Sequence, residues 1–233
     1  RYISHYPDAT NDDILNAIAD IYGMNKNQIV VGNGAAELLY AICRLPGYTG
    51  AFVPAPGFSE YKAALEASRI PVRDIYYRPR EDEHGKPYFE VPYLALETFA
   101  AELKGQDGRI IVFLGNPNNP DGTLLDKNHI RTIASMLKDA NSLLVIDESF
   151  IDFVGNDTLQ DNEYSMRSLV NEFDNIIVVH SFTKFYAVPG LRIGAAFSNP
   201  LIIEQLNSFI PTWSVNTLAQ SYTEAALNDV EYV

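Results

Sequence analysis

The chain of 233 residues has little of several features that would place it in a specialised class of protein. Its one cysteine, Cys43, excludes an internal disulfide, and without a CxxC pair it does not indicate a structural zinc site. No apolar run approaches the roughly 18 residues of a membrane helix, and the initial RYISHYPD lacks the apolar segment of a signal peptide. We therefore expect a cytoplasmic protein, with Cys43 a buried and unreactive thiol.

Basic residues are also scarce. The 17 Lys and Arg against 30 Asp and Glu give a net charge of −13. No basic run offsets this charge, so we expect neither nucleic acid nor a membrane surface as a partner. His5, His84, His129 and His180 are scattered without the spacing of metal ligands, so we expect no metal.

Apolar residues, in contrast, are plentiful. They make up 47% of the chain, with 14 Tyr and 12 Phe, and the mean hydropathy is −0.08. This composition excludes intrinsic disorder and is typical of a globular domain. A single domain of this length buries roughly 70–75% of the surface that its unfolded chain exposes, so a substantial core is expected.

Short β-branched runs alternate with longer amphipathic segments along the chain. Strands are predicted at residues 28–31, 51–54, 109–114, 142–147, 175–181 and 192–197. Helices are predicted at residues 12–22, 35–45, 59–69, 93–104, 127–138, 164–172, 199–209 and 215–228. Several strands are apolar throughout, as in sheets covered on both faces. The prediction is an α/β fold, a three-layer αβα arrangement with a mostly parallel sheet, and a polar surface excursion at 78–90.

Polar motifs follow the predicted strands, at the sheet edge where ligands bind in this architecture. The turn GNGAAE (32–37) opens a helix and suits a phosphate, but Glu37 replaces the third glycine of the dinucleotide fingerprint. The loop NPNNPDG (116–122) follows a second strand, and Asp147 with Glu148 ends a third. Taken alone, GNGAAE is equally compatible with a plain tight turn, whereas a stiff loop and a cap are the usual interpretations of the other two motifs.

The segment HSFTKFYAVPGLRIG (180–194) is the most distinctive, because it places Lys184 among aromatic residues and hydroxyls. A lysine amine becomes a nucleophile when it is desolvated or lies near other cations. Without the other motifs, an ordinary surface lysine would be the preferred interpretation. His180 is interpreted as a buried residue at a strand end rather than as a pocket residue.

Six motifs together carry a family resemblance: YPD, GNGAAE, PxPGFSEY, NPNNPDG, DESF and SFTKFYAVPGLRIG. In this order the chain resembles the fold-type-I aminotransferase superfamily, whose cofactor is pyridoxal 5′-phosphate (PLP). Within it, the chain is similar to threonine-phosphate decarboxylase and then to histidinol-phosphate aminotransferase. The resemblance implies that residues 1–233 are the large PLP-binding domain and run into the start of a small domain. It also implies that the N-terminal arm and the rest of the small domain are missing from this chain.

The resemblance assigns a role to each matching position. Lys184 is similar to the lysine that forms a Schiff base with the cofactor, and Asp147 to the partner of the pyridine nitrogen. Asn119 matches the ligand of the phenolic oxygen, and Phe58 the aromatic residue stacked on the ring. Residues expected at the cofactor phosphate are Gly34, Ala35, Ala36, Ser181, Arg192 and, less strongly supported, Thr183. Tyr6 resembles a tyrosine that reaches the neighbouring subunit's site, which implies a homodimer.

Phe150 favours one branch of the superfamily. Many aminotransferases carry tyrosine at this position, whereas threonine-phosphate decarboxylases resemble this chain here and in PTWSVN (211–216). The resemblance thus favours decarboxylation of L-threonine O-3-phosphate, a phosphorylated amino acid, to 1-aminopropan-2-ol O-phosphate, a product used in cobalamin assembly. Two alternatives remain: an aminotransferase of the histidinol-phosphate type, and a ligand-sensing module of a larger regulator. Asp121 stands where threonine is usual, and the sequence gives no reason for it.

Overall fold

The computed structural model describes residues 4–103, 108–155, 159, 162–229 and 232. At its centre lies a seven-stranded sheet with the order β1-β9-β8-β7-β6-β2-β3. The strands are β1 (Ile29–Gly32), β2 (Tyr48–Ala55), β3 (Val72–Tyr76), β6 (Arg109–Gly115), β7 (Leu143–Asp147), β8 (Ile176–Ser181) and β9 (Gly194–Phe197). Strands β3, β2, β6, β7 and β8 run parallel, and β9 runs antiparallel to both β8 and β1. The mostly parallel sheet is confirmed.

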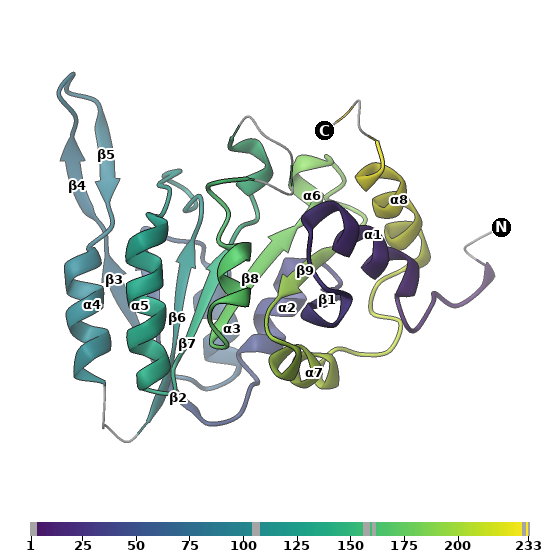
Figure 1. Ribbon diagram of the computed structural model, residues 1–233, viewed down its shortest axis with the longest axis horizontal. Coiled ribbons are helices and arrows are strands. Elements are labelled where there is room, and N and C mark those ends of the chain that lie inside the picture. Colours follow the sequence, from purple (N-terminus) through teal and green to yellow (C-terminus); the bar gives the residue numbers. More distant parts are fainter. Residues whose placement is uncertain (1–3, 104–107, 156–158, 160–161, 230–231, 233) are drawn as a thin grey trace.

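Helices cover both faces of this sheet, so the three-layer α/β prediction is confirmed (Figure 1). The α-helices are α1 (Asp12–Tyr22), α2 (Ala35–Ile42), α3 (Glu60–Ala67), α4 (Tyr93–Glu102), α5 (Lys127–Asp139), α6 (Phe182–Phe185), α7 (Pro200–Phe209) and α8 (Thr217–Leu227). Residues of α1, α4, α5 and α8 belong to one core cluster, and residues of α2, α3 and α7 belong to the other.

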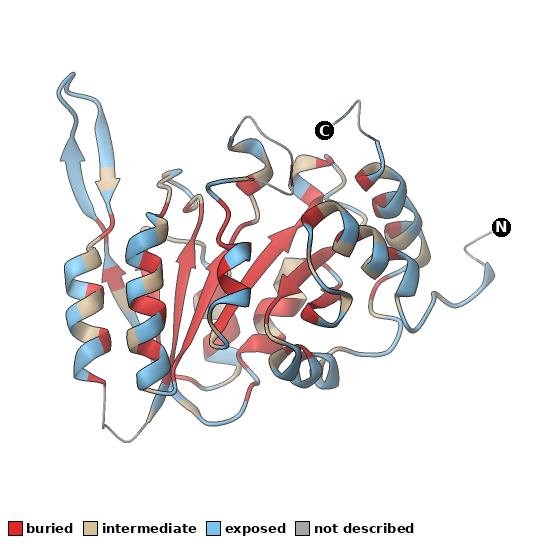
Figure 2. Ribbon diagram, viewed as in Figure 1, coloured by how far each residue is buried: buried red, intermediate tan, exposed pale blue. Residues whose placement is uncertain are grey.

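Successive residues of the central strands enter opposite cores. In β7, Leu144 and Ile146 belong to the first cluster, whereas Leu143 and Val145 belong to the second. Side chains alternate between the faces of a strand, so a strand covered on both faces is apolar at every position. Figure 2 shows the result as buried strands between helices whose outer faces are exposed. Cys43 lies in the second cluster, so the predicted burial of its thiol is confirmed, and this burial raises the pKa of the thiol to about 12.

At two places the structure differs from the local predictions, and at a third it confirms one and adds detail to it. The predicted helix at 164–172 is instead a short 3₁₀ helix, η4 (Arg167–Asn171). The edge strand β3 was not predicted, because only Ile75 of its five residues is buried and the hydrophobic signal is correspondingly weak. The surface excursion at 78–90 is a hairpin of β4 (Arg78–Glu81) and β5 (Pro87–Glu90) that projects from the body (Figure 1). Its residues are nearly all exposed, so no hydrophobic alternation marks it.

Two helix ends are stabilised in common ways, one by a glycine and the other by a capping side chain. Helix α1 ends at Gly23, whose φ of 63° is the left-handed conformation that glycine adopts at low cost. Asp126 caps α5 by accepting hydrogen bonds from the backbone N–H groups of Asn128 and His129. None of the helices formed by the described residues is long and apolar enough to cross a membrane.

Candidate active site

The carboxyl ends of β6, β7 and β8 meet at one edge of the sheet, because these strands are parallel and adjacent. Asp147 lies beside Gly115 on one neighbouring strand and beside Val179 on the other. A cavity of about 40 Å³ opens at this edge, lined by Phe58, Tyr61, Pro117, Asn119, Asp147, Ser149, Phe150 and Lys184. Four residues predicted for the cofactor ring and its lysine therefore line one cavity.

Lys184 lies on the single-turn helix α6, directly after β8. Its amine is 5.8 Å from the centroid of the Phe150 ring, and the residue is exposed on the cavity side of the sheet edge. The amine of Lys184 thus reaches the cavity next to an aromatic ring, with room for a bound molecule beside it. This arrangement suits a lysine that bonds covalently to a bound carbonyl compound.

Asp147 forms the floor of the cavity and is 6% exposed. Its Oδ1 accepts hydrogen bonds from the Ser149 backbone N–H at 2.9 Å and from the Ser149 hydroxyl at 2.5 Å. Its Oδ2 accepts one from the Tyr61 hydroxyl at 2.8 Å. The carboxylate is thus fixed by neutral donors and is paired with no cation among the described residues.

The sequence prediction missed Tyr61, which lies three residues after Phe58. The two rings meet edge to face at 5.7 Å, and Tyr61 stacks on Phe113 at 5.3 Å. The Tyr61 backbone N–H donates to the Phe58 carbonyl oxygen, so the turn at the start of α3 sets both side chains on one side. This spacing of three residues in a helical turn was the available signal.

Asn119 lies in the loop after β6 and reaches the cavity wall. The neighbouring Asp121 accepts hydrogen bonds from the side chains of Asn118 and Thr123, and Asn118 also donates to the Pro56 carbonyl oxygen at 3.0 Å. Asp121, unexplained by the sequence, therefore closes the loop that carries Asn119 and ties it to the segment before Phe58.

The residues predicted for a phosphate gather where β8, β9 and the start of α2 meet. Gly32, Gly194 and Ser181 lie in one row across β1, β9 and β8. Gly34 has a φ of 80°, and a Cβ on it would collide with the guanidinium of Arg192. The Ser181 and Thr183 hydroxyls are 2.8 Å apart. The row is tight, since a Cβ on Gly194 would lie 2.6 Å from the backbone nitrogen of Ala35.

Ala35 and Ala36 are the first two residues of helix α2, so their backbone N–H groups lie at the N-terminal, positive end of the helix dipole. With the Arg192 guanidinium and two hydroxyls nearby, the cluster has the donors that bind a phosphate. Glu37, at the position of the absent third glycine, accepts from the Asn33 backbone N–H at 2.7 Å and from the Ser214 hydroxyl. It thereby ties the segment 211–216 to this turn.

Tyr6 lies apart from these clusters. It is 78% exposed and does not line the cavity, and its ring lies against Trp213 of the same chain, tilted by 30° with 4.6 Å between ring centroids. A position on its own chain's surface leaves the predicted contact with a neighbouring subunit untested.

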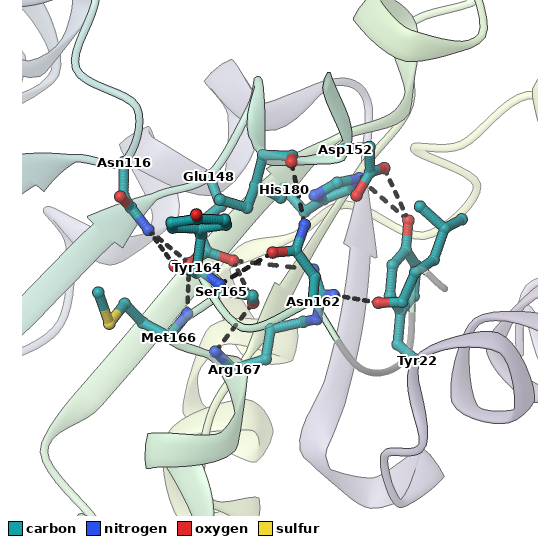
Figure 3. Close-up of polar contacts among 12 residues, drawn as sticks. Tyr22, Asn116, Glu148, Asp152, Asn162, Tyr164, Ser165, Met166, Arg167 and His180 are labelled. Carbon is teal, nitrogen blue, oxygen red and sulfur yellow. Dashed lines mark hydrogen bonds and ion pairs between the residues drawn. The ribbon is translucent and has the colours of Figure 1, made fainter. Parts of the chain in front are cut away.

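A buried polar cluster lies behind the cavity floor (Figure 3). Glu148, 0% exposed, accepts from the Asn116 side chain at 3.1 Å, the Ser165 hydroxyl at 2.7 Å and the Met166 backbone N–H at 2.5 Å. The Arg167 guanidinium is 3.7 Å from Glu148, and its Nη2 donates to the Leu159 carbonyl oxygen at 2.6 Å. This cluster anchors Leu159 and residues 162–167 under the end of β7.

His180 extends this cluster under β8. Its Nε2 is 3.0 Å from the Asp152 carboxylate and 3.3 Å from the Tyr22 hydroxyl, which itself donates to Asp152 at 3.0 Å (Figure 3). The Arg167 guanidinium lies 4.2 Å from the centroid of the Tyr22 ring. The prediction of a buried strand-end histidine is confirmed, since His180 is 1% exposed.

Choosing the site by cavity volume alone would have put it in the wrong place. A larger hollow of about 590 Å³ lies beside α4 and the hairpin, lined by residues that include Arg78, Glu90, Tyr93 and His129. It contains none of the residues singled out by the sequence. The convergent polar groups, rather than the volume, mark the small cavity as the site.

The family model for aminotransferase class I and II matches residues 1–233. The chain belongs to this family. A relative is the adenosylcobalamin biosynthesis bifunctional protein CobDQ of Leptospira interrogans, 34% identical over 98% of this chain and 24% of the relative. Another is the threonine-phosphate decarboxylase of Salmonella typhimurium, 31% identical over 97% of this chain and 58% of the relative. The resemblance stated from the motifs is confirmed.

A solved structure shares the fold: histidinol-phosphate aminotransferase from Sinorhizobium meliloti in complex with pyridoxal-5′-phosphate. It is 23% identical, has a TM-score of 0.77, and matches 98% of this chain and 57% of its own. The chain of this aminotransferase class I and II member therefore spans less than two thirds of each of these proteins.

Family membership and the shared fold support PLP as the cofactor, and the site's chemistry fits it. A carboxylate, a lysine amine and an aromatic ring line one cavity, and a cradle at Gly34 that a Cβ would fill lies beneath Arg192. These are the groups needed for a pyridine nitrogen, an aldehyde, a flat ring and a phosphate.

Proposed function

We propose that this chain is the cofactor-binding part of a PLP-dependent decarboxylase that acts on L-threonine O-3-phosphate. The observation that carries the proposal is the cavity at the carboxyl ends of β6, β7 and β8, where Lys184, Asp147, Asn119 and Phe58 come together. When bound, PLP supplies an electron sink for the electrons of a bond broken at the substrate Cα.

Each side chain has a distinct task in this proposal. Lys184 would hold the cofactor covalently. Once the bond between the substrate Cα and its carboxylate has broken and carbon dioxide has left, Lys184 would return a proton from Nζ to Cα. Asp147 accepts a hydrogen bond from the pyridinium N–H, and Asn119 donates to the phenolic oxygen. Phe58 stacks on the ring. The phosphate is held by the backbone N–H groups of Ala35 and Ala36 next to Gly34, by Ser181 and Thr183, and by Arg192.

Phe150 is the reason to favour decarboxylation. It lines the cavity 5.8 Å from the Lys184 amine, in the position where many aminotransferases have a tyrosine that donates to the phenolic oxygen. The relatives CobDQ and threonine-phosphate decarboxylase support the same branch. The second candidate is an aminotransferase of the histidinol-phosphate type, which the shared fold allows.

The proposed enzyme is a cytoplasmic homodimer. In it, the exposed Tyr6 of each subunit reaches the phosphate of the other subunit's cofactor. An exposed aromatic residue outside its own chain's cavity is what such sharing requires.

Carbon dioxide release from L-threonine O-3-phosphate tests the proposal in the full-length protein supplied with PLP. We expect one carbon dioxide and one 1-aminopropan-2-ol O-phosphate per substrate without any added keto acid. Lys184→Ala should abolish both products. Release that requires 2-oxoglutarate, or product formed only from histidinol phosphate and 2-oxoglutarate, would establish the aminotransferase instead.

A further inference from the structure

Tyr61 is the residue of the cavity whose surroundings are most constrained. Its ring lies between Phe58, edge on at 5.7 Å, and Phe113, stacked at 5.3 Å, and the residue is 1% exposed. A ring clamped on two sides has little freedom to rotate, so the position of its hydroxyl is fixed by packing. That hydroxyl points at the cavity floor and donates to Oδ2 of Asp147 at 2.8 Å.

The acceptor sites of Asp147 can be counted. An ionised carboxylate offers about four lone-pair sites, two on each oxygen. Both sites of Oδ1 are used by the backbone N–H and hydroxyl of Ser149. One site of Oδ2 is used by Tyr61, so one acceptor site, on the oxygen that Tyr61 holds, receives no donor from the residues that the structure describes.

The orientation of this last site depends on Tyr61. The terminal torsion of an aspartate is broad, so a carboxylate held from one side can rock about its Cβ–Cγ bond. Ser149 is a near neighbour of Asp147 in sequence, and both of its hydrogen bonds to the carboxylate go to Oδ1. Tyr61, which comes from α3 and is distant in sequence, holds the other oxygen, Oδ2.

We propose that Tyr61 is a positioning residue, which turns the free acceptor site of Asp147 toward the ring nitrogen of the bound cofactor. This inference rests on the proposed function, because it needs PLP in the cavity. Tyr61 acts through Asp147 and contributes no chemistry of its own.

The Tyr61 hydroxyl is also a dependable donor. Burial, together with the charge of Asp147 and the hydrogen bond to it, raises the pKa of Tyr61 well above its ordinary value. The hydroxyl therefore keeps its proton at neutral pH. A serine or water in its place would be free to turn its hydrogen elsewhere.

The test compares two ligands and two variants in the full-length protein. The ligands are PLP and its 1-deaza analogue, in which a C–H group replaces the ring nitrogen. Tyr61→Phe keeps the ring between Phe58 and Phe113 and removes only the hydroxyl. We expect it to weaken PLP binding about tenfold, the effect of one hydrogen bond to a charged group, and to leave binding of the analogue nearly unchanged.

Tyr77→Phe is the matched control. Tyr77 is buried, and its hydroxyl has no hydrogen-bond partner within the part of the chain that the structure describes. Its removal should change the affinity for neither ligand. Equal weakening of both ligands by Tyr61→Phe, or no weakening at all, would overturn the positioning role.

A different result would contradict the proposed function. If the unmodified protein binds PLP no better than Lys184→Ala does, and neither shows the visible absorption of lysine-bound PLP, the cavity is not a PLP site. If the unmodified protein binds PLP covalently and Tyr61→Phe has the same affinity as that protein for both ligands, only the proposed role of Tyr61 is contradicted.

Discussion

Asp147 and Glu148 are consecutive carboxylates at the end of β7, and the fold puts them to opposite uses. Asp147 faces the cavity, is held by the neutral donors Tyr61 and Ser149, and keeps an acceptor site open. Glu148 is enclosed by Asn116, Ser165 and the Met166 backbone, with Arg167 as its counter-charge. Asp147 is the last residue of β7, and Glu148 follows it with its backbone N–H still donating to the Val179 carbonyl oxygen. Consecutive residues of an extended chain point to opposite sides, so one carboxylate can serve a ligand while the other holds the scaffold.

The largest expected effect is a loss of stability, and it is found by neutralising Glu148 and Asp147 in separate variants. Glu148→Gln leaves the buried Arg167 guanidinium without its ion-pair partner, which should lower the free energy of unfolding by about 3 kcal/mol. Asp147→Asn leaves no buried cation unpaired and should cost about 1 kcal/mol, while weakening PLP binding about tenfold or more. Urea unfolding and PLP titration of both variants measure the two effects.

A double variant sharpens this comparison. Glu148→Gln with Arg167→Met removes both charges, so it should be more stable than the sum of the single losses implies. If Asp147→Asn destabilises the fold more than Glu148→Gln, the division between a ligand-facing and a structural carboxylate is wrong.

Asp152 gives a smaller effect that depends on pH. Burial alone would raise its pKa, but His180, with help from Arg167 and Tyr22, outweighs burial and holds the pKa below its ordinary value. A carboxylate with a depressed pKa contributes stability that is complete above its unfolded pKa, about 4, and is lost as the pH falls through its folded pKa. The free energy of unfolding should therefore decline below about pH 4.

Asp152→Asn removes this titration. Its unfolding free energy should be lower than that of the unmodified protein at neutral pH and should fall less steeply on acidification. Urea unfolding between neutral pH and about pH 3 follows both curves. Parallel curves would show that the buried cluster behind the cavity does not contribute to the acid sensitivity.

The smallest expected effect concerns Asp126, a carboxylate that lies neither in the cavity nor in the buried cluster behind it. Asp126 caps the exposed start of α5, and Asp126→Ala should lower the free energy of unfolding by about 1 kcal/mol with no change in PLP affinity. Asp126→Ser keeps a capping oxygen and should recover most of the loss. A change in PLP binding by Asp126→Ala would mean that general destabilisation, rather than local contacts, explains the results at Asp147.

The central strands and the motifs after them were predictable because their signals are local. The apolar runs of β6, β7 and β8 reflect burial on both faces, and each polar motif directly follows its strand. The hairpin β4–β5 and the edge strand β3 were missed because strands that bury little surface carry no hydrophobic pattern. The 3₁₀ helix η4 was predicted as an α-helix, because a short segment anchored by Glu148 is governed by contacts distant in sequence.

The sequence by itself determined the family, the layered α/β architecture and the residues that surround the proposed cofactor, since order and spacing of motifs suffice for these. Only the tertiary structure decided which of two adjacent carboxylates is open to a ligand and that Tyr61 belongs to the site. It also gave Asp121 a role and placed His180 in a buried cluster. These depend on donors that lie up to 158 positions away along the chain. Hydrogen bonds between side chains that meet only after folding leave no periodic signal in the sequence.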